Sequence, residues 1–433
     1  MGCMETVMEI DYKWGANLSM SVFDEIYEKY SLERYLNRTE ILIRVSKPDK
    51  QMNYNDLWMR IVAQRRQEGR KISLKDQKGN DFWYVMTSHG EKKLQDIDNM
   101  GREKLEELTA KETRKLLMAD MMIEEAFYSS VIEGAFSTKK RTKELIKTKD
   151  PKDKSEQMIL NNYQCMIFSM ENINEDLSEE LFIAMHKIIT YETLEPDEIT
   201  EKYRNDIVFV ADPNKSEPIY TPPKAEDIQG HMDDLFLFIA EQPDENDIHP
   251  LVKAAIIHFY IGYVHPFFDG NGRVARVFAY LYLLKNGYDF FKFFSISSII
   301  HKHRGKYYKA FKDTEDNGSD LTYFIITQLE IILESITIVV DKLMAKLQKE
   351  LLKEELIKDG IVLSDRQEKF LNFMDRKDNN LATIKGYQKQ LKVSYETGRR
   401  ELSELAQLGL FRKAKKGREF IYKYVGAKGY FSE

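Results

Sequence analysis

The stretch His265-Pro-Phe-Phe-Asp-Gly-Asn-Gly-Arg-Val-Ala-Arg276 is the part of the chain around which we expect the fold to be organised. Apolar residues recur at three- and four-residue steps on both sides of it, over 251–264 and 274–285, which predicts two helices. Pro266 and the Asp-Gly-Asn-Gly run interrupt the pattern. We therefore expect the first helix to end here and the second to open near Asn271.

The glycines of this stretch predict an anion-binding site. Gly270 and Gly272 allow a tight backbone whose N–H groups converge at the positive end of the second helix. Arg273 and Arg276 lie three residues apart in its first turn, so we expect both guanidiniums to leave from one face. The helix dipole disfavours cations at this end. A polyanionic ligand would remove that conflict, and phosphates are the ligand that we expect.

Two further side chains complete a candidate reaction centre. His265 titrates near neutral pH and can take a proton from an attacking hydroxyl. Asp269 is a hard oxygen ligand suited to a magnesium ion shared with phosphates. A base, a metal ligand, an anion nest and two arginines are the parts that phosphoryl-type transfer requires. The alternative is a Gly-rich turn with a capping Asp and two solvated arginines, and the joint spacing favours the reaction centre.

The stretch resembles the signature of the Fic (filamentation induced by cAMP) family, His-Pro-Phe-x-Asp/Glu-Gly-Asn-Gly/Lys-Arg-x-x-Arg, and matches it at every fixed position. The resemblance implies a helical enzyme that transfers AMP from ATP to a Ser, Thr or Tyr hydroxyl of a target protein. It implies His265 as the general base, Asp269 as the magnesium ligand, and contacts from Arg273 and Arg276 to the outer phosphates. It also implies a phosphate cradle of consecutive residues, Gly270, Asn271 and Gly272.

The same resemblance bears on the kind of group transferred. The phosphorylating, Doc-like branch of the family carries Lys where this chain has Gly272. This difference argues against a kinase.

A segment upstream predicts a helix that ends at a charged residue. Residues 103–133 contain no Gly or Pro, and Gly134 follows at a position that suits a helix end. Ser129 and Glu133 are four residues apart and share a face. A carboxylate in a last turn opposes the helix dipole, so Glu133 is either solvated or paired with a cation. The resemblance implies an inhibitory helix at about 114–133, in which Glu133 pairs with Arg276 and blocks the seating of the ATP γ-phosphate.

Two other regions gain a role from the resemblance. Residues 205–221 read as a β-hairpin in a helical region. The family relationship implies a flap whose edge, at Ile207, Val208 and Phe209, pairs with an extended target segment, and an ordinary surface hairpin is the alternative. Tyr307 and Tyr308 stand where relatives line the adenine pocket, with packing in the core as the alternative.

Composition sets the wider frame. With 433 residues and 42% hydrophobic content, the chain is long enough for two or three domains with real cores. We expect a mixed module over 1–95, a Fic helical domain over 96–356 and a third domain over 357–433. A net charge of −6 does not mark the chain as a nucleic-acid-binding or membrane protein. We also expect no membrane span and no signal peptide. Two cysteines in the whole chain indicate a reducing compartment, so we expect a cytoplasmic protein.

The third domain has its own pattern. Two short helices, a third helix over 395–408 and a basic hairpin predict a winged helix, with the third helix for recognition. Residues 361–433 hold 16 Lys and Arg against 9 Asp and Glu, an excess consistent with DNA contact. Protein contact or homodimerisation is the equal alternative. The candidate DNA contacts are the basic residues of the third helix and the hairpin turn, Arg399, Arg400, Lys415, Lys416 and Arg418.

The sequence thus predicts a mainly α protein adenylyltransferase that uses ATP and magnesium, modifies a protein or itself, and is inhibited through Glu133. The first alternative is a DNA-binding regulator whose Fic domain senses nucleotide. The intact set of His265, Asp269, Asn271 and Arg273 favours the enzyme. The second alternative is a hydrolase that removes AMP in the same site, with Glu133 positioning the water.

Overall fold

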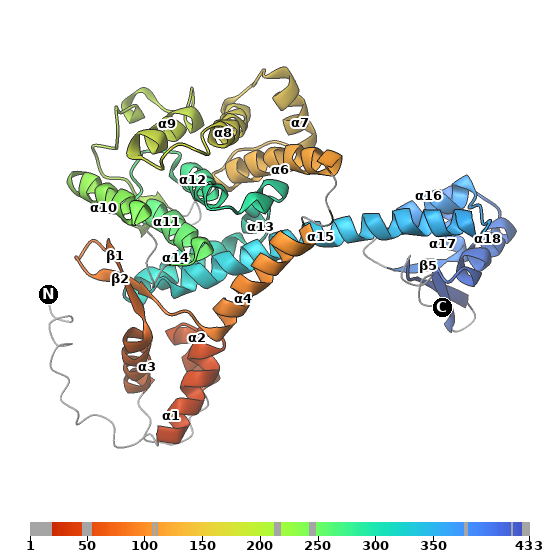
Figure 1. The fold of residues 1–433 in the computed structure, drawn as a ribbon, viewed down its shortest axis with the longest axis horizontal. Helices are drawn as coiled ribbons and strands as arrows, with labels where there is room; N and C mark the ends of the chain where they lie inside the picture. Colours follow the sequence, from red (N-terminus) through yellow and green to blue (C-terminus); the bar gives the residue numbers. More distant parts are fainter. Residues whose placement is uncertain are drawn as a thin grey trace. The chain divides into compact units, whose positions relative to one another are not determined.

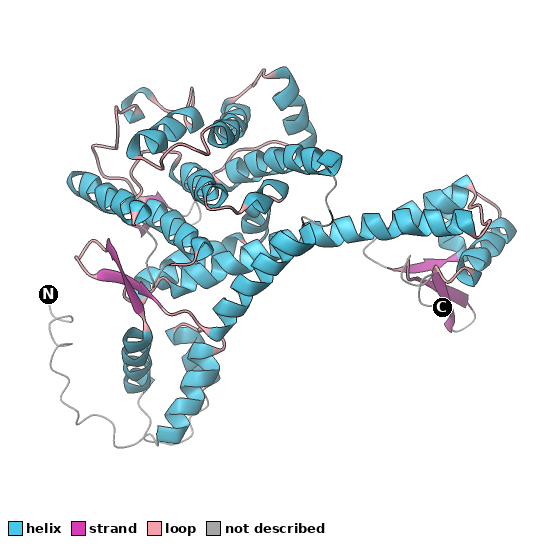
Figure 2. Ribbon diagram, in the orientation of Figure 1, coloured by secondary structure: helices cyan, strands magenta, loops and turns pink. Residues whose placement is uncertain are grey.

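The computed structural model describes residues 20–45, 54–105, 108, 111–211, 218–241, 248–375, 380–416 and 419–426. By their contacts, the residues of the chain fall into two compact units, Met1–Val339 (unit 1) and Val340–Glu433 (unit 2). The border lies inside one long helix, α15 (Thr322–Lys358). Helices make up most of both units, as the sequence predicts (Figures 1 and 2).

Unit 1 begins with short helices and a hairpin and continues as a helical domain (Figure 1). Its first part contains α1 (Met20–Tyr27), α2 (Arg38–Arg44), α3 (Tyr54–Glu68), β1 (Arg70–Lys75), β2 (Asp81–Tyr84) and α4 (Ser88–Asp98). The helical domain contains α6 (Lys111–Ile132), α7 (Lys139–Thr148), α8 (Lys154–Glu171), α9 (Glu179–Ile189), α10 (Ile228–Ala240), α11 (Pro250–Val264), α12 (Asn271–Lys285), α13 (Ile296–Lys302), α14 (Arg304–Asp316) and the first part of α15. A two-stranded hairpin, β3 (Val210–Ala211) and β4 (Pro218–Tyr220), lies between α9 and α10.

The pair α11–α12 forms the centre of unit 1, which confirms the two helices predicted around the motif. Pro250 stands at the first turn of α11, where its missing N–H costs nothing. Both helices are buried almost all round, as expected of helices that are apolar on every face. Figure 1 shows α12 between α11 on one side and α6 on the other. The motif loop between α11 and α12 is therefore held by a close-packed core.

The expected border near residue 95 does not coincide with a border between compact units. The β1–β2 hairpin is antiparallel, with Lys71 opposite Trp83. Strand β2 is hydrogen-bonded to the segment that precedes α15. Trp83 N–H donates to Ser319 O, and Leu321 N–H donates to Trp83 O. Trp83 and Tyr84 are buried. The N-terminal segment thus shares one unit with the helical domain.

Unit 2 consists of the end of α15, three helices and a small sheet. The helices are α16 (Asp365–Met374), α17 (Ile384–Leu391) and α18 (Tyr395–Gln407), and the strands are β5 (Leu381–Thr383), β6 (Phe411–Lys416) and β7 (Glu419–Tyr424). The sheet is antiparallel in the order β5-β7-β6. Ser394 caps α18 through its hydroxyl, as its sequence position predicts. These are the elements that the winged-helix interpretation requires, and that interpretation remains a prediction.

Helix α15 is long and apolar enough to cross a membrane by length and composition, with a mean hydropathy of 1.8 over its most apolar window. The sequence analysis had predicted no span at all. In the structure, 61% of that window is buried inside the protein. The core helix of a soluble protein meets the same criterion, because it too must be apolar on most faces.

Candidate active site

The motif loop is shaped by three backbone features. Helix α11 ends at Val264, and His265 follows in the left-handed region with φ 50°. This conformation costs about 1–2 kcal/mol for a residue with a side chain. Asn271 closes the loop from the other end, since its side chain accepts from Phe267 N–H and donates to Phe267 O. Gly270, with φ 85°, is the N-cap residue that precedes α12.

His265 is set up as a neutral base. Its Nδ1 lies 3.3 Å from Gly262 O, which can accept a hydrogen bond from Nδ1–H. In this tautomer Nε2 carries the lone pair that takes a proton. Burial lowers the pKa of His265 below its ordinary value, so the ring is neutral at pH 7.

The two glycines at the start of α12 leave the backbone there open to close approach. A Cβ on Gly270 would meet Thr190 Cγ2 at 2.8 Å, and its positive φ also disfavours a side chain. A Cβ on Gly272 would meet Glu133 Oε1 at 2.2 Å. The glycines therefore allow other groups to approach the backbone at the N-terminus of α12. In this structure the group that does so at Gly272 is a carboxylate.

Asp269 and Arg273 form an ion pair beside the nest. Arg273 donates to Asp269 Oδ2 at 2.9 Å and to Ile189 O at 3.1 Å, and its side chain is fully buried. Burial raises the pKa of Asp269, but the Arg273 charge and a hydrogen bond from Gly270 N–H outweigh this effect and leave the pKa lowered. Asp269 is therefore ionised, with 37% of its side chain exposed, as an oxygen ligand for a cation should be.

Arg276 turns to helix α6 and meets both predicted inhibitory residues. Its Nε donates to Ser129 Oγ at 3.0 Å, and its terminal nitrogen donates to Ser129 O and Glu133 Oε1, each at 2.9 Å. The pairing of Glu133 with Arg276 that the resemblance implied is thus present in the structure. The two motif arginines have different partners, because Arg273 turns to the end of α9 and Arg276 to α6. The two guanidiniums therefore do not share a partner in the described part of the chain.

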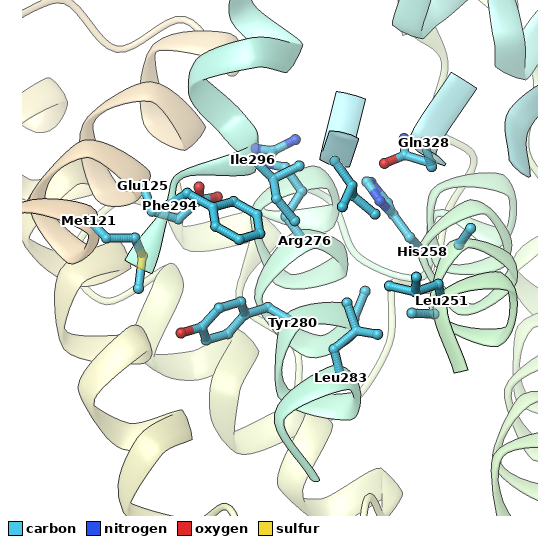
Figure 3. A pocket seen from close by; sticks show the side chains of 14 residues that line it. Met121, Glu125, Leu251, His258, Arg276, Tyr280, Leu283, Phe294, Ile296 and Gln328 are labelled. Carbon is cyan, nitrogen blue, oxygen red and sulfur yellow. The ribbon is translucent and has the colours of Figure 1, made fainter. Parts of the chain in front are cut away.

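Helix α6 has a second attachment to the core at Glu125. This buried carboxylate accepts from Ser295 Oγ at 2.7 Å, from Ser297 N–H at 3.0 Å and from Ser297 Oγ. Ser295 is also the N-cap of α13, so Glu125 lies at the positive end of that helix, where a carboxylate is favoured. Figure 3 shows Glu125 and Arg276 lining a common cavity of about 40 Å³.

The predicted adenine-pocket residues occupy different environments. Tyr307 is buried, and its hydroxyl lies 2.9 Å from His258 Nε2. Tyr308 is 39% exposed, with the Arg304 guanidinium over its ring. Burial raises the pKa of Tyr308, and the negative charge of Glu133 raises it further. The assignment of these rings to an adenine pocket remains a prediction.

The predicted flap is shorter as a hairpin than its sequence suggested. Ile207, Val208 and Phe209 precede β3 and are not in a strand. Ile207 and Phe209 are exposed by 58% and 60%, which is unusual for large apolar side chains. Part of the hairpin, 212–217, lies outside the described residues.

Sequence reasoning missed three residues that shape the site. His186 donates from Nε2 to Asp269 O at 2.8 Å, and its ring stacks on Phe267. Burial lowers the pKa of His186 to about 4, so it is a neutral donor. Arg204 hydrogen-bonds to the carbonyl of His265 at 2.8 Å. Glu125, the third, lies on α6. These residues lie far from the motif in sequence, and no local pattern marks them.

The candidate DNA contacts all belong to unit 2. Arg399 and Arg400 are exposed on α18, each beside a glutamate of the same helix. Lys415 is exposed on β6. Arg418 and the side chain of Lys416 lie outside the described part of the chain.

Comparison with known proteins agrees with the motif. A family model described as Fic/DOC family matches residues 176–283. A protein adenylyltransferase Fic of Nematostella vectensis is 26% identical over 181 residues, which cover 40% of this chain and 40% of the relative. A protein of the same name from Drosophila mojavensis is 28% identical over 167 residues, covering 37% of this chain and 32% of the relative. The chain thus matches less than half the length of these curated relatives.

The search of solved structures gives weaker similarities. A Fic family protein from Desulfovibrio desulfuricans is 18% identical with a TM-score of 0.49, covering 79% of this chain and 98% of that one. Fic-1 from C. elegans is 19% identical with a TM-score of 0.44, covering 59% of this chain and 71% of that one. The segment that matches the Fic/DOC family model, residues 176–283, includes the whole motif His265–Arg276.

Proposed function

We propose that this chain transfers AMP from ATP to a hydroxyl side chain of a protein. The observation that carries the proposal is the placement of a neutral imidazole, His265, on the same short loop as the Gly270–Gly272 nest. Attack on a bound phosphate needs a base and a phosphate cradle close to each other, and one short loop carries both here. The names of the curated relatives, protein adenylyltransferase Fic, support AMP as the transferred group.

The reaction follows from these groups. The N–H groups at the start of α12 bind the phosphates of ATP, and His265 Nε2 takes the proton of the target hydroxyl. The hydroxyl oxygen forms a bond to the α-phosphorus. The bond from that phosphorus to the oxygen bridging the β-phosphate breaks, and pyrophosphate leaves. Positioned proton transfer of this kind contributes about 10²–10⁴-fold to rate.

A magnesium ion bound with ATP fits the residues present. Asp269 offers an ionised, partly exposed carboxylate beside the nest, and hard oxygen ligands of this kind suit magnesium. We propose Asp269 as its protein ligand, with the ATP phosphates as further ligands. Bound there, the ion would neutralise phosphate charge. Arg273 fixes the Asp269 side chain through their 2.9 Å hydrogen bond.

Glu133 keeps the enzyme in a restrained state in this proposal. Its carboxylate lies against Gly272 and pairs with Arg276, so it takes up space and charge that an outer phosphate would need. A carboxylate there also repels phosphate. ATP would then bind with its α-phosphate out of line with the attacking hydroxyl.

The target segment would dock on the flap. Exposed Ile207 and Phe209 offer apolar contacts next to the short strand β3, where an extended segment can add by backbone pairing. The target is a protein of unspecified sequence or the chain itself.

The experiment that tests the proposal is labelling with ATP carrying ³²P at the α- or the γ-position, with magnesium, in the full-length protein. Transfer of AMP labels protein from α-³²P-ATP and releases pyrophosphate. Label that arrives from γ-³²P-ATP instead would identify a kinase. A Glu133→Gly variant should be tested beside the wild type, so that autoinhibition does not hide the activity.

A further inference from the structure

We propose that Arg204 is a positioning residue that joins the described parts of the flap (205–211 and 218–221) to the catalytic loop, so that a target segment seated there meets His265 in a fixed geometry. This inference rests on the proposed function, in which His265 is the base and the flap receives the target. It assigns a role to a residue that lies 61 positions from the histidine in sequence and outside the motif.

The contacts of Arg204 carry the proposal. The residue is 2% exposed. In the described part of the chain, all four of its side-chain hydrogen bonds go to backbone carbonyls. Two of them lie at the end of α11, on His265 at 2.8 Å and Val264 at 3.5 Å. The other two lie at the beginning and beyond the end of the flap, on Asp206 at 2.8 Å and Pro223 at 2.5 Å. One guanidinium thus bridges both roots of the flap and the histidine.

The main chain of Arg204 adds a fifth connection. Its N–H donates to Pro266 O at 2.9 Å. Side chain and main chain together therefore hold the carbonyls on both sides of the His265–Pro266 peptide. The Val264 and His265 carbonyls belong to the two peptides that flank the Cα of His265, the residue with the left-handed conformation. Asn271 holds the next residue, Phe267, from the other side.

Physical chemistry explains why an arginine occupies this position. The carbonyls at the end of α11 have no partner within their helix, and they form the negative end of its dipole, which favours a cation. The planar guanidinium presents five donors in a fixed fork, which suits several carbonyls arranged around it. A buried cation without such partners would be costly. An amine on a flexible stem cannot reproduce this geometry.

The second root of the flap is fastened to the same helix independently. Tyr220, on β4, donates its hydroxyl to Tyr263 O at 2.8 Å. Gln77, in the β1–β2 turn, donates its N–H to the Tyr263 hydroxyl at 2.9 Å and its side-chain amide to Thr221 O at 3.0 Å. The flap is therefore hydrogen-bonded to the last turn of α11 through both of its ends. Of these contacts, those of Arg204 are the ones that reach His265.

The test compares Arg204→Lys with a matched control, Arg65→Lys. Arg65 is another guanidinium that is buried among hydroxyl and carbonyl acceptors, Ser31, Tyr323 and Leu36 O, and it lies in the N-terminal part of unit 1. Both substitutions are expected to lower Tm. Their difference should lie in exchange of backbone amides and in catalysis, measured on the full-length Glu133→Gly background at a temperature where each variant is folded.

Backbone amide hydrogen exchange, followed by mass spectrometry, tests the proposal without requiring any enzymatic activity. Arg204→Lys should speed exchange in both 205–211 and 262–267, and Arg65→Lys should leave these segments as in the parent. Unchanged exchange in either segment with Arg204→Lys would overturn the proposal, even if the chain proved to have another activity.

The kinetic arm separates positioning from binding. Arg204→Lys should lower kcat for labelling about 10- to 100-fold through misplacement of base and target, with the KM for ATP nearly unchanged. Arg65→Lys should keep the parent kcat. Equal loss of kcat in both variants would show a general effect of stability and would also overturn the proposal.

Discussion

The Glu133 carboxylate lies 2.9 Å from the Arg276 guanidinium and directly against Gly272, where a Cβ would meet it at 2.2 Å. The Glu133 side chain, at the end of α6, thus pairs with the arginine and also lies against the backbone of Gly272. A phosphate would use both of these groups. The arginine is nearly buried, with 4% of its side chain exposed, and the carboxylate retains 26%. The contact is specific enough to block a site, and Glu133 retains some contact with solvent.

Removal of the carboxylate should release the site. Glu133→Gly is expected to raise self-labelling by about 100-fold, because correct alignment of reacting groups is worth rate factors of this size. Arg276→Ala should not recover activity, since the arginine is also needed to seat ATP. Glu133→Gln should also raise self-labelling, and Glu124→Gln, which removes a carboxylate that pairs with Lys139 on α6, is its matched control. Equal labelling by wild type and Glu133→Gly would demote Glu133 to a surface residue.

His265→Ala should abolish labelling while ATP binding is retained, because a general base acts mainly in the transition state. Labelling and ATP affinity, by isothermal titration, should be measured on the Glu133→Gly background. Undiminished labelling would exclude His265 as the base.

The dependence of activity on pH should extend into the acid range. Burial lowers the pKa of His265 in the folded protein, and the base must be neutral to accept a proton. The rate should therefore stay level as pH falls through about 6.5, the ordinary value for histidine, and drop only at lower pH. A profile of kcat/KM against pH for the Glu133→Gly variant measures this. A midpoint at or above about 6.5 would contradict the assigned environment of the ring.

The second attachment of α6 should also control activity. Glu125→Gln replaces an acceptor of three hydrogen bonds at the N-terminus of α13 with an amide whose nitrogen cannot accept them. We expect a loss of stability of about 1–3 kcal/mol. We also expect increased self-labelling with Glu133 intact, because α6 is then held less firmly. Denaturant unfolding and labelling should be measured together, and lower stability without greater labelling would limit Glu125 to a structural role.

The basic residues of unit 2 give a prediction about DNA. If Arg399, Arg400 and Lys415 contact phosphates, the affinity of the wild type for DNA should fall steeply as the salt concentration rises. Replacing all three residues by Glu should abolish binding. Fluorescence anisotropy with duplex DNA at several salt concentrations measures both. Lys346→Glu, an exposed change of the same sign on α15, is the control for net charge. Absence of binding by the wild type at low salt would favour the protein-contact interpretation.

The sequence alone determined the centre of this protein because its signals are local. The periodicity of 251–264 and 274–285 and the breakers between them place α11, the motif loop and α12 within a residue or two. Gly270 and Gly272 lie at the start of α12, and Gly134 follows the end of α6, as their positions in the sequence predict. Capping, turn formation and helix periodicity depend on neighbours in the chain, so they can be read in order.

The tertiary structure decided what lies against that centre. No spacing rule reveals that Arg276 turns to Ser129 while Arg273 turns to the end of α9, since each guanidinium follows the carbonyls and carboxylates that packing brings near it. Likewise, Arg204 reaches His265 across 61 residues through backbone carbonyls, which are the same in every sequence. Contacts between a long side chain and distant backbone leave no pattern of residue types. That is why the motif could be predicted from the sequence and the residues that hold it in place could not.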